Sequence, residues 1–495
     1  MAPLTAPWYE RDEMILPSEL KLYIADYLDP QSSVKFGIAC KEHWQLCQPL
    51  FKKHTQAFAD APIVTAHNAL DLLRATLRDP TEGWYVREIS FRDRWDDPFT
   101  TPVDDAEQLQ QAAGQMRSLY PHSGTDIEHE CLVTQIEQGL ATGHPASAVA
   151  VLLHHLPNLR TLRLTMGYDN VFEDLLQRIG VEYIDTAKRS SLPLKYLRTV
   201  SLAHYDTEGC IPPDCALPFL RLPSIHTFAA SMMGGDFTRG RFESQVPFHP
   251  HPQSGIEEFF FAGCQFDSAA LEYLISCTSN LKRFTYSAGG CCTSEDAYGA
   301  KIVLKALTEH ARDSLEYLVL AHFMYHEEEA VVRDFYDNEK DRPTDADLSM
   351  FTKLHSLSAN WAMLWPELSL QPAITHHEGG GRSESIGLSC TPLDIRDILP
   401  VSLENLHLTG VFDREEWEGV VEPLKAVNEE TPNLTKDKIR VDGRVQNKFT
   451  HKDERTLVVV GGWDDNEQKM IFGGGDKAWV KRVWATDKLF EGHGW

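Results

Sequence analysis

Residues 256–286 read IEEFFFAGCQFDSAALEYLISCTSNLKRFTY, and this stretch decides the fold. It begins and ends with a six-residue unit, IEEFFF from Ile256 and LKRFTY from Leu281, with apolar side chains at the first, fourth and sixth places. Alternation of this kind is typical of a short strand with one buried face. Between the two units the apolar spacing changes to a helical period. The helical stripe consists of Ala270, Leu271, Leu274 and Ile275. The stretch therefore predicts strand, helix and strand.

The same unit recurs along the chain on both sides of this stretch. The other copies are LRTLRL from Leu159, LRTVSL from Leu197, IHTFAA from Ile225, LEYLVL from Leu315, LHSLSA from Leu354 and LENLHL from Leu403. We expect an earlier copy in VREISF from Val86 and a later one near KIRV at Lys438. A second helical stripe precedes the unit at Leu315 and is formed by Ile302, Val303, Ala306 and Leu307.

Units of one helix and one short parallel strand cannot bury both faces alone, but stacked units form a continuous core in a curved solenoid. The pattern resembles a leucine-rich repeat protein with degenerate repeats, like those that follow an F-box in many fungal proteins. The unit starts lie roughly 25 to 50 residues apart, at or above the usual repeat length, so several repeats must carry insertions. We therefore predict an α/β fold with a solenoid of irregular repeats over residues 81–445. The alternative is a doubly wound α/β domain.

The N-terminal stretch MILPSELKLYIADYLDPQSSVKFGIACKEHWQLC, residues 14–47, carries many large apolar side chains at helical spacing. It predicts three short helices, the first beginning at Pro17, the second capped by Asp29 or Ser32, and the third disturbed by Pro49 and Lys52-Lys53. The apolar positions are Leu16, Leu20, Ile24 and Leu28, then Val34, Phe36 and Ile38, then Cys40, Trp44, Cys47 and Leu50. Roughly 40 residues are too few to bury a stable core alone, so this excess indicates a second surface, against a neighbouring domain or another protein.

These landmarks resemble the F-box. The chain has Leu16-Pro17-Ser18-Glu19-Leu20, then Ile24, Leu28, Val34, Cys40-Lys41 and Trp44. Two of them depart from the family pattern, because Val34 stands where Leu is more usual and Trp44 lies one residue further from Cys40-Lys41. The resemblance implies binding to the Skp adaptor, which connects to a cullin scaffold and a RING ubiquitin ligase. The residues that it implies for this contact are Leu16, Pro17, Leu20, Ile24, Leu28, Val34 and Trp44. The alternative is an ordinary helical cap on the next domain.

The remaining boundaries follow from these assignments. We expect an F-box-like helical domain over residues 13–54, a helical linker over 55–80, and a C-terminal capping segment over 446–495. In the capping segment, short strands and the side chains of Trp463, Trp479 and Trp484 are expected to cover the end of the solenoid. Loops are expected to interrupt the repeats at residues 92–130, 322–350 and 370–390, the second of them strongly acidic.

Strand alternation predicts which side chains face away from the core. With the fourth and sixth places buried, the third and fifth point outward. Most of these are small and polar, but Glu258, Phe260, Arg283 and Tyr317 combine a charge pair with aromatic area, a composition enriched in binding hot spots. We predict that these four bind a partner protein. Alternatively, Phe260 packs under a loop and Arg283 only pairs with Glu258.

Composition and charge exclude several classes of function. The 495 residues include 73 acidic and 47 basic side chains, giving a net charge of −26, which opposes nucleic-acid binding. No apolar run approaches the ~20 residues that span a bilayer, and the N-terminus lacks the pattern of a secretory leader. The ten cysteines form no disulfide framework or metal-type spacing. We expect a soluble protein of the cytoplasm or nucleus with no membrane partner.

The sequence contains no complete catalytic or metal-binding motif of a known spacing. The candidates were His154-His155, His376-His377-Glu378, HEEEA from His326 and GGGDK from Gly473. None has the spacing of a zinc site or a phosphate-binding loop, and there is no nucleophile elbow or dinucleotide fingerprint. We therefore expect no enzyme activity, no cofactor and no metal.

Three functions remain at this stage. The first is a substrate-recognition adaptor of a cullin-RING ligase, whose F-box binds the Skp adaptor and whose repeats hold an unidentified protein substrate near the transferring enzyme. The second is a repeat scaffold that binds a partner without degradation. The third is an unrecognised α/β hydrolase or transferase.

Overall fold

The structure is a computed structural model that describes the chain in segments. These are residues 16–92, 105–119, 127–166, 171–185, 189, 192–204, 209–235, 254–289, 300–323, 348–360, 399–413, 424, 433–434, 439–446 and 453–459. The chain divides into two compact units, one made of residues 1–162 with 191–197 and the other of residues 163–190 with 198–495. Each unit is described by itself below.

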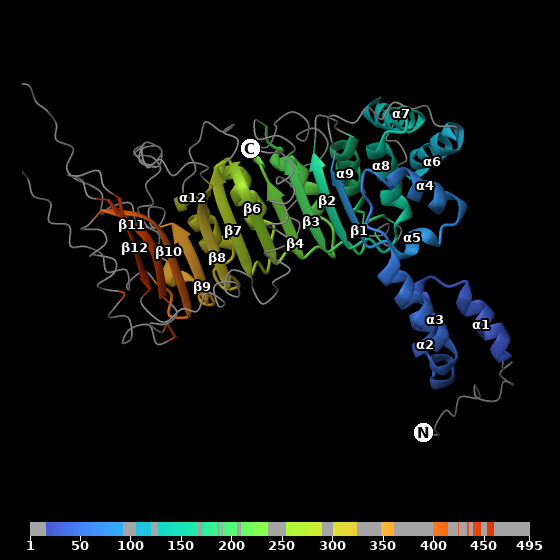
Figure 1. Ribbon diagram of the computed structural model, residues 1–495, viewed down its shortest axis with the longest axis horizontal. Helices are drawn as coiled ribbons and strands as arrows, with labels where there is room; N and C mark the ends of the chain where they lie inside the picture. The colour runs from blue at the N-terminus through green and yellow to red at the C-terminus, as the bar shows by residue number, and fades with distance from the viewer. Residues whose placement is uncertain are drawn as a thin grey trace, which may run out of the picture. The chain divides into compact units, whose positions relative to one another are not determined.

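The first unit is mainly helical. Its helices are α1 (Ser18–Asp26), α2 (Pro30–Ile38), α3 (Lys41–Asp60), α4 (Ala69–Arg78), α5 (Glu82–Tyr85), α6 (Ala106–Leu119), α7 (Ile127–Ala141) and α8 (Pro145–His155). Strand β1 (Glu88–Arg92) follows α5, and β2 (Thr161–Met166) begins in this unit and ends in the next. Helices α4, α6, α7 and α8 pack on one another (Figure 1).

The second unit contains a largely parallel sheet with strands in chain order. Its strands are β3 (Thr199–His204), β4 (Thr227–Ser231), β5 (Gly234–Gly235), β6 (Glu258–Phe266), β7 (Arg283–Gly289), β8 (Tyr317–Phe323), β9 (Ser356–Asn360), β10 (Asn405–Asp413), β11 (Ile439–Gln446) and β12 (Asp453–Val459). Neighbours from β3 to β11 pair in parallel, with β5 beside β6, and β12 alone runs antiparallel (Figure 1).

The predicted six-residue units are confirmed as the strands of the repeats. Every strand from β2 to β10, apart from the two-residue β5, begins at the third residue of its unit, and β1 does the same two residues after Val86. The copy expected near Lys438 is strand β11. In the eight units from Leu159 to Leu403, the first, fourth and sixth side chains are no more than 2% exposed. The alternation therefore sets both the strand and its buried face.

The residues between strands differ from repeat to repeat. Helix α9 (Val171–Glu182) follows β2, and a 3-10 turn with the short α10 (Leu217–Leu220) follows β3. Helices α11 (Ser268–Ser276) and α12 (Ala300–His310) come before β7 and β8 and pack on each other. Their apolar stripes are buried as predicted at Ala270, Leu271, Leu274, Ile275, Val303, Ala306 and Leu307. The side chain of Ile302 lies outside the described residues.

An aromatic cluster forms the centre of the second unit's core. Phe259 and Phe261 of β6 stack with ring centroids 5.2 Å apart, and Phe284 and Tyr286 of β7 stack at 6.3 Å. The phenolic oxygen of Tyr286 accepts a hydrogen bond from the backbone N–H of Phe266 at 3.2 Å, which satisfies a polar group inside the core. Burial of these large side chains supplies much of the hydrophobic stabilisation of the sheet.

Two expectations from the sequence were wrong. The loop predicted over residues 92–130 contains helix α6 and the start of α7. One side of α6 is buried: its residues are at most 3% exposed and have helical spacing, namely Leu109, Ala112, Ala113 and Met116. The polar residues between them led to the prediction of a loop. Pro49 does not end the third helix, because α3 continues to Asp60 and crosses the boundary placed at residue 54. Tertiary packing of Leu50 and His54 outweighs the proline's missing N–H.

Several other sequence predictions fall on residues outside those described. They include residues 324–347 of the loop predicted over 322–350, the loop at 370–390, the three tryptophans of the capping segment, and the motifs at His326, His376 and Gly473. The two ends of the 322–350 range belong to β8 and to a 3-10 turn at Leu348–Met350. Among the described residues, none of the helices has both the length and the apolar character that a bilayer span requires.

Candidate protein-binding surfaces

Helices α1 to α3 form a small three-helix group with little core of its own. The Asp29 carboxylate caps α2 by accepting hydrogen bonds from the backbone N–H groups of Gln31 at 2.9 Å and Ser32 at 3.1 Å. Only Ala25, Cys47 and Leu50 make up the buried apolar cluster of this group, and Phe36 and Phe51 pack partly against it. Most large apolar side chains of the three helices are therefore not part of this buried cluster.

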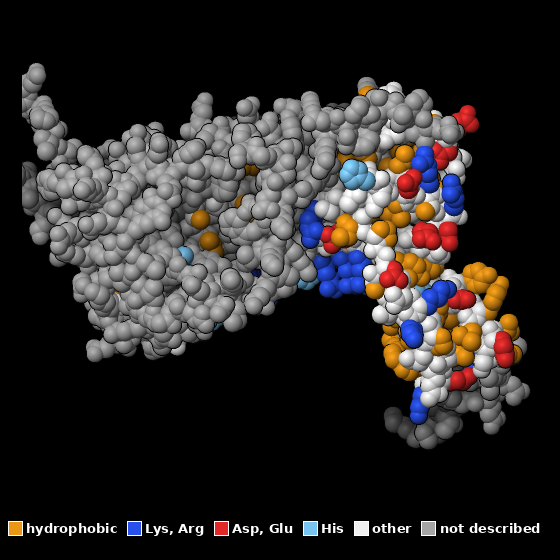
Figure 2. All heavy atoms as spheres, viewed as in Figure 1, with side chains coloured by type: hydrophobic (Ala, Val, Ile, Leu, Met, Phe, Trp, Pro, Cys, Tyr) orange, Lys and Arg blue, Asp and Glu red, His pale blue; other side chains and the backbone are white. Residues whose placement is uncertain are grey.

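Those side chains lie on the surface. Nine of the thirteen large hydrophobic residues that are exposed in the described part of the chain belong to this group: Leu16, Leu20, Leu22, Tyr23, Ile24, Tyr27, Val34, Ile38 and Trp44. We call these nine residues the apolar face. Figure 2 shows hydrophobic side chains gathered over α1 to α3. An exposed apolar patch of this extent on a small helical group is typical of a protein interaction site.

The predicted adaptor contacts fall mostly on this surface. Leu20 is 49% exposed and Ile24 42%, while Leu16, Pro17, Val34 and Trp44 are also exposed. Leu28 is half-buried, so it offers less area than its place in the stripe suggested. The Trp44 ring leans on Phe51 with centroids 5.1 Å apart, which fixes its orientation.

The sequence pattern did not indicate three members of the apolar face: Leu22, Tyr23 and Tyr27. Ile38 was identified as an apolar helical position but was not among the predicted adaptor contacts. The hydroxyls of Tyr23 and Tyr27 are 2.9 Å apart, and their rings meet edge to face at 4.9 Å. Two aromatic residues four apart on one helix were a signal for this pair, because such residues are neighbours on a helix surface. Helix α1 is thus apolar on more sides than the single stripe indicated.

Side-chain contacts join the three helices to the first strand region within the first unit. Gln31 of α2 donates a hydrogen bond to the side-chain oxygen of Asn158 at 3.0 Å, and Asn158 donates to the carbonyl of Trp84 at 2.8 Å. In α3, His54 Nδ1 lies 2.9 Å from the hydroxyl of Tyr85. Burial lowers the pKa of His54, so its ring stays neutral at physiological pH. These contacts hold α1 to α3 against α5 without using the apolar face.

The second candidate surface is formed by partly exposed residues on strands of the second unit. The third residues of successive repeats pair in register across β4, β6, β7 and β8, so Thr227, Glu258, Arg283 and Tyr317 stand in one row. Arg283 Nε lies 3.3 Å from Glu258 Oε1, and the Thr227 hydroxyl donates to Glu258 Oε2 at 3.1 Å. The Arg283 guanidinium carbon lies 4.4 Å from the centre of the Tyr317 ring. We call these four residues the polar row.

The structure thus brings three of the four predicted partner residues into direct contact. The pairing of Arg283 with Glu258, which was the alternative interpretation, is present, and Arg283 also stacks on Tyr317. Phe260 lies one row further along, between Ala229 and Thr285, and is half-buried. An ordered Arg on an aromatic ring loses little side-chain entropy when it binds a partner, which is a property of hot-spot residues.

Towards the end of the sheet the same rows become polar. The Asn405 amide donates to the Ser356 hydroxyl at 3.1 Å, and Ser358 and His407 lie 3.2 Å apart through Oγ and Nδ1. A serine and a histidine in contact are part of a hydrolase triad, but here both lie on one flat row of parallel strands.

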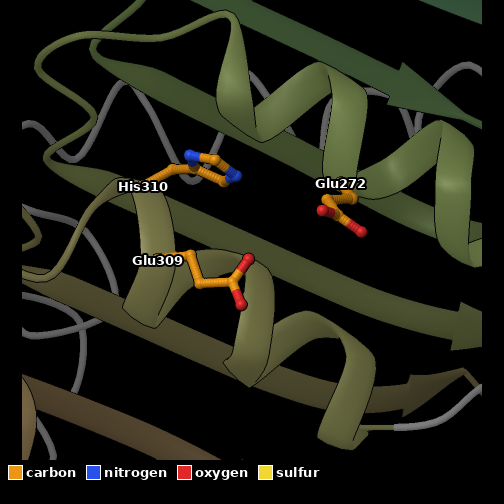
Figure 3. Close-up of side chains that lie close together, drawn as sticks. All are labelled: Glu272, Glu309 and His310. Atoms are coloured by element: carbon orange, nitrogen blue, oxygen red, sulfur yellow. The ribbon is translucent and has the colours of Figure 1, made fainter.

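Two groups of titratable residues were tested as metal or catalytic sites. Burial lowers the pKa of His154 to about 4, and its Nδ1 lies 3.3 Å from the Ala150 carbonyl, as in a histidine that packs within a helix. Glu272 of α11 and Glu309 and His310 of α12 place ligand atoms within 4.8 Å of one another (Figure 3). All three are exposed and Lys305 reaches Glu309 at 3.9 Å, so an acidic surface cluster explains this group.

Comparison with known protein families agrees with the fold. The family model described as a leucine-rich repeat domain matches residues 68–457. The chain therefore belongs to the leucine-rich repeat family, whose domains are typically non-enzymatic scaffolds that bind other proteins. A search of curated proteins found no match to this chain. The matched range begins after α3, so the apolar face lies outside it.

Proposed function

We propose that this protein is a substrate-recognition adaptor of a cullin-RING ubiquitin ligase. In this proposal α1 to α3 are an F-box that binds the Skp adaptor, and the repeats hold a protein target. The chain performs no bond chemistry, because its contribution is to raise the concentration of the target near the transferring enzyme. It acts in the cytoplasm or nucleus, and the free thiols of the seven described cysteines fit a reducing compartment.

The main support for the proposal is that the apolar face is exposed rather than packed against the other described residues of the first unit. Leu20 and Ile24, the middle of the F-box-like stripe, are nearly half exposed, while the contacts to α5 use polar and aromatic residues of α2 and α3. A helical cap on the next domain would bury its stripe against that domain. The exposure instead favours a separate polypeptide as the cover, with a few apolar anchors supplying most of the binding energy.

The polar row is the proposed contact for the target. Glu258, Arg283 and Tyr317, with Phe260 beside them, offer a charge pair, a stacked guanidinium and aromatic area within neighbouring strands. Their neighbours in the same rows are small, so a partner can approach the sheet closely there. The test is Arg283→Ala, which should reduce capture of target proteins while leaving binding of the Skp adaptor unchanged.

Co-purification of the full chain with the Skp adaptor tests the proposed function. The wild-type chain should bind it, and the variant Leu20→Asp with Ile24→Asp should not, since two charges in the interface leave buried groups unpaired. The matched controls are Ile63→Asp and Val401→Asp, which change apolar residues that are 49% and 65% exposed outside the apolar face. Both controls should bind as the wild type does. Failure of the wild-type chain to bind, or binding by the double variant, contradicts the proposal.

A second candidate is a repeat scaffold that binds a partner without degradation. It is favoured by the family match, which covers the repeats and stops short of α1 to α3. Quantitative proteomics separates the two: loss of an adaptor should make its target accumulate, whereas loss of a scaffold should leave protein levels unchanged. The double variant should reproduce the accumulation if the apolar face links the target to the ligase.

A further inference from the structure

Two arginines lie side by side at the start of neighbouring strands in the first unit. The backbone N–H of Arg160 donates to the carbonyl of Arg87 at 2.9 Å, and that of Thr161 donates to the same oxygen at 3.0 Å. Arg87 and Arg160 therefore occupy matching places immediately before β1 and β2. Figure 2 shows Lys and Arg side chains gathered on the surface near β1.

Arg87 is held in place by the protein rather than left free. Its guanidinium carbon lies 3.7 Å from the centre of the Phe58 ring, in contact with the end of α3. Its Nε is buried and has no hydrogen-bond partner among the described residues, while the side chain as a whole is partly exposed. Burial, together with the nearby charge of Arg160, lowers the pKa of Arg87. A guanidinium held on an aromatic ring loses little side-chain entropy when its exposed part binds an anion.

The charge balance around Arg87 and Arg160 differs from that of another arginine in the first unit. Among the described residues, no carboxylate forms an ion pair with Arg87 or Arg160. By contrast, Arg74 in the same unit pairs with Asp105 at 2.8 Å and with Asp71 at 3.0 Å. In a chain with a net charge of −26, acidic side chains are available to neutralise such a pair. Two adjacent cations without a carboxylate repel each other, and a bound anion would relieve that repulsion.

We propose that Arg87 and Arg160 bind an acidic segment, rich in Asp and Glu, of a partner protein. Neighbouring strands lie about 4.8 Å apart, and alternate side chains of an extended peptide lie roughly 7 Å apart, so long carboxylate side chains can reach both guanidinium groups. The net charge of −26 opposes a nucleic acid, whose run of phosphates extends well beyond two arginines. At physiological salt the Debye length is about 8 Å, so acidic side chains further away repel the segment only weakly. A short segment therefore interacts mainly with the two arginines.

This surface differs from both surfaces described above. It uses neither the apolar face nor the polar row, and it requires only that the chain bind protein partners, as the repeat family does. The inference therefore stands or falls apart from the role in a ubiquitin ligase. The acidic segment belongs to whichever protein the repeats recognise.

Fluorescence anisotropy with the full chain tests the inference. The probe is a short labelled peptide in which Glu alternates with Ser, and the reference peptide has Gln in place of each Glu. The acidic peptide should bind, with an affinity that falls as salt is raised, and the Gln peptide should not. Arg160→Gln should weaken the acidic peptide about tenfold, because one of the two charges is lost.

Two further variants keep the test decisive. Arg78→Gln removes an exposed arginine of α4 in the same unit and should leave the affinity unchanged. Arg87→Lys keeps the charge but loses the forked geometry, so it should weaken binding less than Arg160→Gln while preserving the contact with Phe58. Thermal unfolding of each variant checks that the fold is intact. Equal binding by the wild type and Arg160→Gln, or by the Glu and Gln peptides, overturns the inference. Selective binding of a Ser peptide with a single phosphoserine, with the Glu peptide inactive, overturns it as well.

Discussion

Helices α1 to α3 and the sheet of the second unit differ in how much of their apolar surface they bury. In the sheet, the apolar places of each unit are almost completely buried and the outward rows are mostly polar. In α1 to α3, the buried cluster has three residues and the apolar face has nine. Stacked repeats bury each other's faces within one chain, whereas a short three-helix group has no such neighbour.

The sheet therefore gains its free energy of folding from apolar burial within the chain, whereas α1 to α3 keep apolar area available for binding. Substitutions in the sheet core should change the free energy of unfolding, and substitutions on the apolar face should change binding instead. A side chain that is half exposed in the free chain has little burial to lose.

Phe284→Ala should give the largest loss of stability. Phe284 is fully buried between Phe261 and Tyr286, so its removal leaves a cavity and should lower the free energy of unfolding by about 3–5 kcal/mol. Urea denaturation of the second unit's transition measures this. The matched control Leu20→Ala should cost less than about 1 kcal/mol. A large loss from Leu20→Ala would contradict the contrast, since it would make Leu20 a core residue.

Acid should destabilise the first unit through His154. Its pKa is about 4 in the folded protein, against an ordinary value of 6.5 when unfolded, so the unfolded chain binds more protons between these values. The contribution of neutral, buried His154 to the free energy of unfolding is complete above pH 6.5. It is lost as the pH falls towards 4, by up to about 3 kcal/mol. Urea midpoints of the wild type and His154→Gln at pH 7 and pH 4.5 measure it. The stability difference between the two proteins should shrink at pH 4.5, and a constant difference refutes this role.

Pro49→Ala should stabilise the helices that carry the apolar face. Pro49 lies inside α3, where it lacks an N–H for the helical hydrogen bond. The substitution should raise the free energy of unfolding by about 1–2 kcal/mol. This is less than the full cost of a proline inside a helix, because alanine also increases the conformational entropy of the unfolded chain. Local stability from amide exchange in residues 41–60 is the measurement. A loss of stability would show that the ring of Pro49 makes packing contacts that matter more than the missing bond.

The ion pair of the polar row should contribute little to stability. The side chains of Arg283 and Glu258 are 29% and 12% exposed, so solvent screens part of their attraction. A double-mutant cycle with Glu258→Gln and Arg283→Gln should give a coupling of about 0.5–1 kcal/mol. The same variants should reduce partner binding more than this. A coupling far above that range, with unchanged partner binding, would assign the row a purely structural role.

The sequence was most informative where a short period repeats. The alternation in units such as LKRFTY from Leu281 was enough to place the strand starts, because a shift by one residue would expose every buried side chain. It was less informative for α6, because the small side chains of Ala112 and Ala113, flanked by glutamines, give only a weak apolar pattern although both are buried. It also failed at Pro49, since local propensity says nothing of the packing that keeps α3 continuous.

For the candidate surfaces, the sequence predicted members but not their full extent. The stripe of Leu20 and Ile24 was visible from spacing, but the exposure of Tyr23 and Tyr27 depends on how little of α1 the other helices cover. The outward position of Glu258, Arg283 and Tyr317 followed from strand alternation. That Arg87 and Arg160 are neighbours could be seen only once the structure placed their strands side by side.

Hydrogen–deuterium exchange of the full chain, with and without the purified Skp adaptor, tests most directly whether a second polypeptide covers the apolar face. Added adaptor should slow amide exchange in residues 16–50 and leave exchange in the strands of the second unit unchanged. Unchanged exchange in residues 16–50 at saturating adaptor would contradict it.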